Sequence, residues 1–511
     1  MSLAHAPTHS SAWRTPRAAW PTKPMAAGEL QTDVSGTLLV YLMLVSPALL
    51  AYLLDPAGVI LCAGAALLAA LAYIGCGLMF SSQRDISGYV LIPLWISATQ
   101  NLYLGAVAER ADALSIQVSL LAHLVYAVGL VSVFGFVLKA NIQDPLVKVS
   151  AAVALALLLF GVVSVALLHA PMVAMVTSAR NMITPAVFLL LGLLVAQRVR
   201  QDHFTRFVVA LAWLTITFGL VEYVLSEWVW GLFNIDTLWI KKGIPNLAHW
   251  GLPANFVSSE RFFGEQIRRM ASSYADPVNF GTVVFFFFML AWYARHWVLV
   301  IFCLLAIALA ISKGALLGLL IFFTVWAHYF GGRFLFICGA VLASVLGAAL
   351  VGYTLLHSTQ SLLTHVHGLV AAITGLPAHP FGRGLGGVGV LAEGSDDIRE
   401  SGLGLIIGQL GLLAFVVFGT FFVAIAKRLP SVTDVRERVL VVSLFYAIFF
   451  NIAFNEVALS PNSCAGYFLL LGIVLGRSRT ENISVNKTEA NHGPGYRHPT
   501  TFRNPLLRPP P

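Results

Sequence analysis

The chain has 511 residues, of which 58% are hydrophobic and only 11% are charged, and its formal net charge is +8. About 25% of the residues of a soluble globular domain are charged, so this composition cannot cover a water-exposed surface and excludes a soluble protein. The basic surplus would suggest nucleic acid in a soluble protein, but no nucleic-acid motif accompanies it, and we interpret it first as a topology signal of a membrane protein.

The two ends of the chain differ in composition from the long apolar middle. Residues 1–36 are rich in Pro, Ala and Ser and have no apolar core or cleavage pattern of a secretory signal, so we predict a disordered cytoplasmic tail. Residues 478–511 are polar and Pro-rich, and contain too few apolar side chains to offset the entropy of ordering, so we predict a second disordered cytoplasmic tail. Residues 37–477 form one predicted membrane domain.

Apolar runs of the length needed to cross a bilayer, about 20 residues each, fill this domain. They predict an all-α polytopic integral membrane protein with about 12–14 transmembrane helices. The predicted helices span residues 37–54, 57–80, 86–108, 114–138, 148–168, 181–196, 207–226, 278–294, 297–311, 314–330, 334–357, 402–426, 439–457 and 462–476.

Lys and Arg collect in the segments 197–206 and 427–438 and in the C-terminal tail. Because short cytoplasmic loops carry an excess of basic residues, these segments and both termini are predicted to be cytoplasmic. Two long loops, 227–277 and 358–401, then emerge on the outer face, and loops of this length are usually functional or disordered. We expect them to form short interfacial helices, anchored by Trp228, Trp230, Trp239 and Trp250.

The first long loop ends in a basic segment, with Arg261, Arg268 and Arg269 shortly before the next predicted helix. A guanidinium group stays charged and donates in a planar fork that suits phosphate, so these arginines are candidate phosphate ligands; ordinary interfacial charges are the alternative. Asp276 is predicted to cap the following helix, with Pro277 in its first turn.

The second long loop is glycine-rich over residues 375–389, which suits a loop that approaches an anion closely. Arg383, Arg399 and Glu400 supply charge near it, although a carboxylate at the start of a helix also suits the helix dipole without any chemistry. Lys313, between two apolar runs, is either a further ligand or a lysine that extends to the interface.

Other polar residues give fewer indications. Glu222 and Glu456 lie in or beside apolar runs, where a carboxylate is costly unless it is paired or faces a wet cavity. The five cysteines show no metal-ligand or redox spacing, so we expect them to be packing residues, and we expect neither a metal nor another cofactor.

Three motifs follow one another in the second half of the chain. They are R-x-x-S-x-x-x-D-P-x-N-F from Arg269 to Phe280, S-K-G-A-L-L-G-L-L from Ser312 to Leu320, and the glycine-rich stretch from Pro380 to Leu413. In this order, at one membrane face, they resemble the bacterial O-antigen ligase and Wzy-type polysaccharide polymerase superfamily over residues 266–477. Lys313 stands where this family usually has arginine, and Glu400 stands where the ligases typically have histidine.

The resemblance implies a GT-C-like glycosyltransferase fold in the bacterial inner membrane, with both loops and the active face in the periplasm. It implies polymerisation of undecaprenyl-pyrophosphate-linked repeat units into exopolysaccharide, capsule or O-antigen, without a cofactor and beside a flippase and a chain-length regulator of the same pathway. Glu400, as base or acceptor orienter, and Arg269 and Arg383, as pyrophosphate ligands, are then catalytic. The candidate substrate-binding residues are Arg261, Arg268, Lys313, Arg399, Asp276 and His379.

Two alternatives stay open. His379, in the second loop, is compatible with an O-antigen ligase, which transfers the finished polysaccharide to lipid A-core. A transporter or flippase would use as many helices, but its site is expected near the membrane midplane between related halves. The sequence shows no convincing internal repeat, and its informative residues lie in the outer loops, so we favour an enzyme.

Overall fold

The computed structural model describes residues 85–110, 116, 119–140, 142–242, 252–262, 265–357, 359–389, 398 and 401–492. The predicted helices 37–54 and 57–80 and the predicted N-terminal tail lie outside these residues. Within them the chain is almost entirely helical, and one antiparallel hairpin, β1 (Val257–Phe262) and β2 (Glu265–Arg268), lies in the first long loop. The predicted all-α class is therefore confirmed for the described part of the chain.

The helices of the first half are α3 (Ser87–Val90), α4 (Ile92–Val107), α6 (Ala122–Ser132) with the π-turn η1 (Val133–Val137), α7 (Pro145–Ala166), α8 (Met172–Val195), α9 (Gln201–Leu225), α10 (Glu227–Leu232), α11 (Ile235–Lys241), and the short η2 (Ala254–Phe256) and η3 (Ser272–Tyr274). Those of the second half are α12 (Pro277–Ala294), α13 (Trp297–Ala310), α14 (Lys313–Phe330), α15 (Gly332–His357), α16 (Thr359–Thr374), α17 (Gly402–Leu410), α18 (Leu413–Arg428), η4 (Leu429–Ser431), α19 (Val435–Phe454), η5 (Glu456–Leu459) and α20 (Pro461–His492).

Among the described residues, eight helices are long and apolar enough to cross a membrane: α7, α8, α9, α12, α14, α15, α18 and α19. Two shorter apolar stretches, His123–Phe136 and Trp297–Ala310, add to them. Of the apolar membrane-crossing part of α8, and likewise of α12, 83% is buried inside the bundle, whereas only 22% of that of α14 is buried. The apolar side chains that these helices leave exposed are stable in contact with lipid and not in contact with water. The chain is therefore a multi-pass membrane protein.

Several predicted helices differ from the structure. The last, predicted over 462–476, continues as α20 to His492, so residues 478–492 are helical where a disordered tail was predicted. Residues 402–426 form two helices, because the chain turns at Gly411, whose φ of +61° is left-handed. The helix predicted from residue 181 begins at Met172, directly after Pro171, so Arg180 lies inside it. The helix predicted over 86–108 is broken at Leu91, ahead of Pro93.

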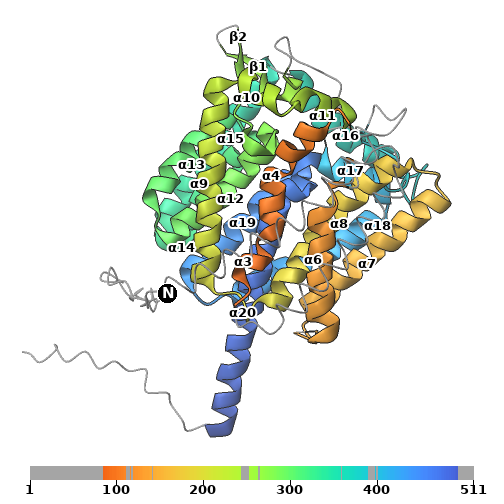
Figure 1. Cartoon of the computed structure of the whole chain (residues 1–511). Coiled ribbons are helices and arrows are strands. Elements are labelled where there is room, and N and C mark those ends of the chain that lie inside the picture. Colours follow the sequence, from red (N-terminus) through yellow and green to blue (C-terminus); the bar gives the residue numbers. More distant parts are fainter. Residues whose placement is uncertain are drawn as a thin grey trace, which may run out of the picture.

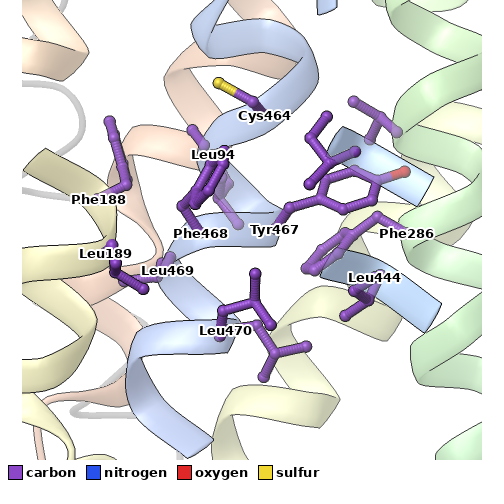
Figure 2. Close-up of a cluster of buried hydrophobic side chains, with 14 of the residues drawn as sticks. Leu94, Phe188, Leu189, Phe286, Leu444, Cys464, Tyr467, Phe468, Leu469 and Leu470 are labelled. Atoms are coloured by element: carbon purple, nitrogen blue, oxygen red, sulfur yellow. The ribbon is translucent and has the colours of Figure 1, made fainter. Parts of the chain in front are cut away.

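Helix α20 forms the centre of the bundle, where it packs along α8, α12 and α19. Its close approach to α8 depends on two glycines, since a Cβ placed on Gly472 would lie 2.9 Å from the Cα of Gly192. Around this contact the buried core is aromatic and aliphatic, as Figure 2 shows for Tyr467, Phe468 and Phe286. The Tyr467 hydroxyl donates to the carbonyl of Thr282 at 2.6 Å. Small residues at helix contacts are the usual means of close packing in membranes.

The two long loops lie at the same end of the bundle. In Figure 1 the hairpin, α10, α11 and α16 are at the top, while the C-terminal part of α20 leaves the bundle at the bottom. The expectation of short helices in the first loop is met by α10 and α11. Trp230 and Trp239 are buried and Trp228 is 66% exposed, whereas Trp250 lies outside the described residues.

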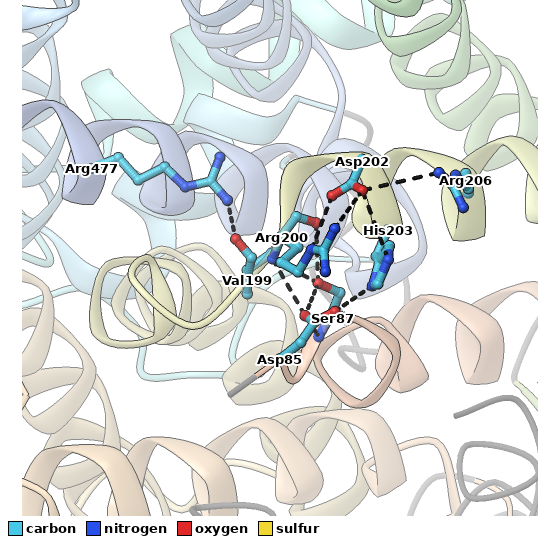
Figure 3. A network of polar contacts seen from close by, with 8 residues as sticks. All are labelled: Asp85, Ser87, Val199, Arg200, Asp202, His203, Arg206 and Arg477. Atoms are coloured by element: carbon cyan, nitrogen blue, oxygen red, sulfur yellow. Dashed lines mark hydrogen bonds and ion pairs between the residues drawn. The ribbon is translucent and has the colours of Figure 1, made fainter. Parts of the chain in front are cut away.

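A polar network closes the opposite end, where α3, the start of α9 and α20 meet (Figure 3). Arg200 and Asp202 form an ion pair of 3.0 Å, and the His203 imidazole bonds to Asp85. Arg477 of α20 donates to the carbonyl of Val199. Charged groups thus gather beyond the apolar spans, as expected where helices reach water, and the assignment of this end to the cytoplasm stays a prediction.

Candidate functional site

Arg268, a predicted substrate ligand, is engaged in a buried ion pair. Its Nη2 lies 2.6 Å from Glu222 Oε2 at the end of α9, and its Nη1 donates to the carbonyl of Tyr223 at 2.8 Å. The side chain of Glu222 is fully buried and that of Arg268 is 14% exposed. Arg268 therefore joins strand β2 to α9, and its guanidinium is not directed at a cavity.

Glu222 is the centre of this contact, since both of its carboxylate oxygens are used. Oε2 also accepts from the indole Nε1 of Trp230 at 2.9 Å, and Oε1 accepts from the backbone N–H groups of Ala271 and Ser272 at 2.8 and 3.0 Å. The carboxylate that the sequence marked as costly is thus paired. It fixes the segment that leads into η3 and α12.

Arg269, which was predicted to bind pyrophosphate, joins the segment before η3 to α13. Its Nε donates to the carbonyl of Ala310 at 3.0 Å, and its backbone N–H donates to the carbonyl of Phe256 at 2.7 Å. Its charge acts on the nearby carboxyl group of Asp276. Arg269 therefore stabilises the position of this segment and does not line the cavity described below.

Asp276 caps α12 as predicted, because its Oδ1 accepts from the N–H of Val278 at 3.1 Å. Its Oδ2 also accepts from the side-chain amide of Asn279 at 2.6 Å. Burial raises the pKa of Asp276, although the helix N–H groups, Arg269 and Lys242 oppose this shift. A buried carboxyl group at a helix start, with its lone pairs partly occupied, is held in one orientation.

A polar cavity of about 210 Å³ lies where the two long loops meet. The first loop contributes Trp239, Lys242, Tyr274 and Asp276, and the second contributes Gly386, Val388 and Gly389. The bundle closes it with residues of α4, α6, α8 and the start of α20. Two cations, Arg180 and Lys242, and two carboxylates, Asp276 and Glu456, share this space.

Lys242 enters the cavity from the end of α11. Its Nζ donates to Asn101 Oδ1 at 2.6 Å and lies 5.7 Å from the ring centre of Trp239. Burial lowers the pKa of Lys242 to about 7; the charge of Arg180 adds to this shift and that of Asp276 opposes it. Near neutral pH this lysine is therefore present both as an ammonium group, which binds anions, and as an amine, which accepts a proton.

Arg180 enters from α8, within a helix that crosses the membrane. Its Nε donates to Asn181 Oδ1 at 3.2 Å, and it forms no ion pair among the residues that the structure describes. His123 of α6 is fully buried nearby, and its two ring nitrogens have no hydrogen-bond partner in the described part of the chain. A charged side chain inside a span is expensive unless it faces a wet cavity or a ligand, so Arg180 is a candidate functional residue.

The glycine-rich loop is hydrogen-bonded through its backbone to the C-terminal end of α17. The N–H groups of Arg383 and Gly384 donate to the carbonyls of Gly408 and Gln409 at 2.9 and 3.1 Å, and the N–H of Leu412 donates to the carbonyl of Pro380 at 2.8 Å. These bonds satisfy backbone groups that the end of a helix leaves free. Only the later part of the loop, from Gly386 to Gly389, reaches the cavity.

The other predicted residues are dispersed. Lys313 is the first residue of α14, directly after its cap Ser312, and His379 is exposed in the turn after α16. Arg261 pairs with Gln266 across the hairpin through its backbone, and its side chain is not among the described ones. Arg399 and Glu400 lie outside the described residues, so their predicted roles stay predictions. They precede Ser401, whose Oγ caps α17 by accepting from Gly404 N at 3.1 Å.

Sequence reasoning missed the two cations of the cavity. Arg180 lies directly before the predicted helix 181–196 and drew no attention there, whereas Pro171, nine residues earlier, is the better signal for the start of this helix. Lys242 belongs to a Lys-Lys-Gly segment that reads as an ordinary loop. Nothing in its local pattern indicates that α11 turns it inward.

No family model matches the chain, and no curated protein matches it either. The fold and the apolar surface together define the class: a multi-pass α-helical membrane protein with a charged cavity under two long loops.

Proposed function

We propose that the protein is a membrane glycosyltransferase that polymerises undecaprenyl-pyrophosphate-linked saccharide units at the periplasmic face of a bacterial inner membrane, on a GT-C-like fold. One observation carries the proposal. The two loops that bear the family-like motifs converge on a single cavity that contains two cations and two carboxylates.

The cations match the donor end of this reaction. A pyrophosphate leaving group needs positive charge where its own negative charge develops, and fixed charges in a water-poor site stabilise it most. Arg180 offers a planar fork of N–H donors, and Lys242 offers an ammonium group held by Asn101. In this proposal they take the role of pyrophosphate ligand that the family resemblance implied for Arg269 and Arg383, neither of which lines the cavity.

The carboxylates match the acceptor end. A sugar hydroxyl attacks the anomeric carbon more readily when a carboxylate orients it or takes its proton. Asp276 and Glu456 both line the cavity. At about 210 Å³ the cavity is smaller than the roughly 300–1,000 Å³ typical of pockets that enclose a whole ligand. It suits the reacting pyrophosphate and adjoining sugar, with the rest of the saccharide outside.

The position of the cavity also favours an enzyme over a transporter. It is roofed by loops at one end of the bundle, whereas a carrier places its site at the midplane between repeated halves.

Deletion and complementation test the proposal. We expect a host without the gene to accumulate single repeat units on the lipid carrier. Wild type should restore long chains, and Arg180→Gln and Lys242→Met should restore about a hundredth as much, the usual loss on removing one charge-stabilising donor. Arg206→Gln, which changes an exposed arginine at the other end of the bundle, should behave as wild type at equal membrane levels.

Two other results would contradict the proposed polymerase function. Long chains that stay on their carrier and fail to reach lipid A would indicate a ligase. Normal saccharides in the deletion strain, together with altered solute uptake, would refute the glycosyltransferase function.

A further inference from the structure

A second cavity, of about 370 Å³, lies at the end of the bundle opposite the first. It opens between the last turns of α14 and α18, the start of α15 and the start of α19. His328, Tyr329, Phe336, Arg438 and Tyr446 supply its polar and aromatic lining. The proposed glycosyl transfer uses none of these residues.

Arg438 is the only cation among the described residues that line this groove, and no carboxylate lines it. Its Nε donates to the carbonyl of Val432 at 2.8 Å, and its guanidinium carbon lies 5.8 Å from the ring centre of Tyr329. These two contacts fix the plane of the guanidinium but use only one of its five N–H donors. The other four donors have no partner among the residues that the structure describes and are available to a ligand.

The neighbouring acids are engaged elsewhere. Glu437 Oε1 accepts from Gln201 and from the Tyr293 hydroxyl, each at 3.2 Å, on another side of α19. Asp434 caps α19 by accepting from the N–H of Glu437 at 2.8 Å. Among the described residues no acid forms an ion pair with Arg438. The groove thus has an uncompensated positive charge.

The walls of the groove are amphipathic, and exposed aromatic side chains lie on the same helix, α14. His328 packs edge-on against Phe336, with ring centres 5.0 Å apart, and Tyr446 is 40% exposed. On the outer surface of α14, Trp326 and Phe330 are 38% and 46% exposed. A ligand that fills this site therefore needs an anionic group next to an apolar part that lies in the bilayer.

We propose that this groove binds the headgroup of an anionic glycerophospholipid, with the phosphate on Arg438 and the acyl chains along α14. A basic pocket between membrane helices, near the ends of their spans, is the usual form of such a lipid site. Free phosphate would gain the charge contact without the apolar one. The aromatic lining of the groove and the exposed apolar side chains on the same helix, α14, are the reason to assign a lipid.

Native mass spectrometry of the purified full-length protein tests this site. We expect phosphatidylglycerol to bind more tightly than phosphatidylcholine. Arg438→Gln should weaken phosphatidylglycerol binding roughly fivefold, the effect of one basic residue near a membrane surface. Arg438→Lys should keep most of the affinity. Arg206→Gln, an exposed arginine at the same end but outside the groove, should leave it unchanged.

A second variant distinguishes loss of the lipid site from misfolding of the protein. Val442→Trp fills the groove while Arg438 is retained, so it should displace the lipid from a protein whose thermal unfolding is otherwise normal. Equal binding of the two lipids, competition by inorganic phosphate at millimolar concentration, or an equal loss in Arg206→Gln would each overturn the proposal. Because the readout is lipid retention, it is independent of the glycosyltransferase function.

Discussion

The carboxylate of Glu222 offers the sharpest test of how the loop is held in place. It accepts four hydrogen bonds, from Trp230, Arg268, Ala271 and Ser272, and it is fully buried. Glu222→Gln keeps the size and shape of the side chain but replaces one oxygen with an NH₂ group. Because both oxygens face donors, either orientation of the amide points N–H groups at N–H groups.

The expected cost follows from these contacts. Removing one partner of a buried ion pair typically costs about 3–5 kcal/mol, and a hydrogen bond to a charged group contributes about 1.5–3 kcal/mol. We therefore expect Glu222→Gln to lower the free energy of unfolding by about 3–5 kcal/mol, a large part of the total of about 5–15 kcal/mol.

Thermal unfolding in a mild detergent measures this effect. Glu227→Gln is the matched control, because Glu227 is an exposed glutamate in the first turn of α10 with no ion pair among the described residues, and its change should stay within about 0.5 kcal/mol. The double variant Glu222→Gln, Arg268→Met should recover part of the lost free energy of unfolding, since it leaves no buried guanidinium without a carboxylate partner. Equal unfolding temperatures for Glu222→Gln and Glu227→Gln would refute the reasoning.

Three further predictions concern other parts of the chain. Gly472→Leu should abolish the folded protein on size-exclusion chromatography, because its side chain would enter α8 at Gly192, whereas Gly419→Leu, which has no atom within 4 Å of its Cβ, should fold normally. As the pH rises from 7 to about 10, the thermal stability of wild type should increase relative to that of Lys242→Met, because over this range only the unfolded chain still binds the proton of Lys242. Parallel curves of unfolding temperature against pH would contradict the buried position of Lys242. His379→Ala should leave surface polysaccharide at its wild-type level, since this side chain is exposed and does not line the cavity; long chains that stay on their lipid carrier in this variant and fail to reach lipid A would instead support the ligase interpretation.

Hydrophobic patterning was sufficient to predict an all-α multi-pass membrane protein and most of its long apolar helices, because a bilayer imposes length and composition on every helix that crosses it. It predicted α12 almost to the residue, since Asp276 and Pro277 mark its start. It could not predict the break between α17 and α18. That break depends on Gly411 meeting a loop that lies about thirty residues earlier in the sequence, and no local pattern reports such a contact.

The candidate site was predicted in outline only. The two loops that meet at the cavity were identified from their length and motifs, and Asp276, one of the residues chosen there, lines it. None of the chosen arginines whose side chains the structure describes lines the cavity, and its cations are Arg180 of α8 and Lys242. Arginine chemistry is the same whether the group binds a phosphate or a buried carboxylate. Only the position of Glu222, about forty-five residues before Arg268, decides between the two roles for that side chain.

The short helix α17 constrains how the protein is made. Its nine residues are about half the number needed to cross a bilayer, so it cannot be inserted from the ribosome as a membrane span of its own. The loop that satisfies its end, around Pro380 and Arg383, is synthesised before it. α17 can therefore pack against a segment of the chain that is synthesised before it.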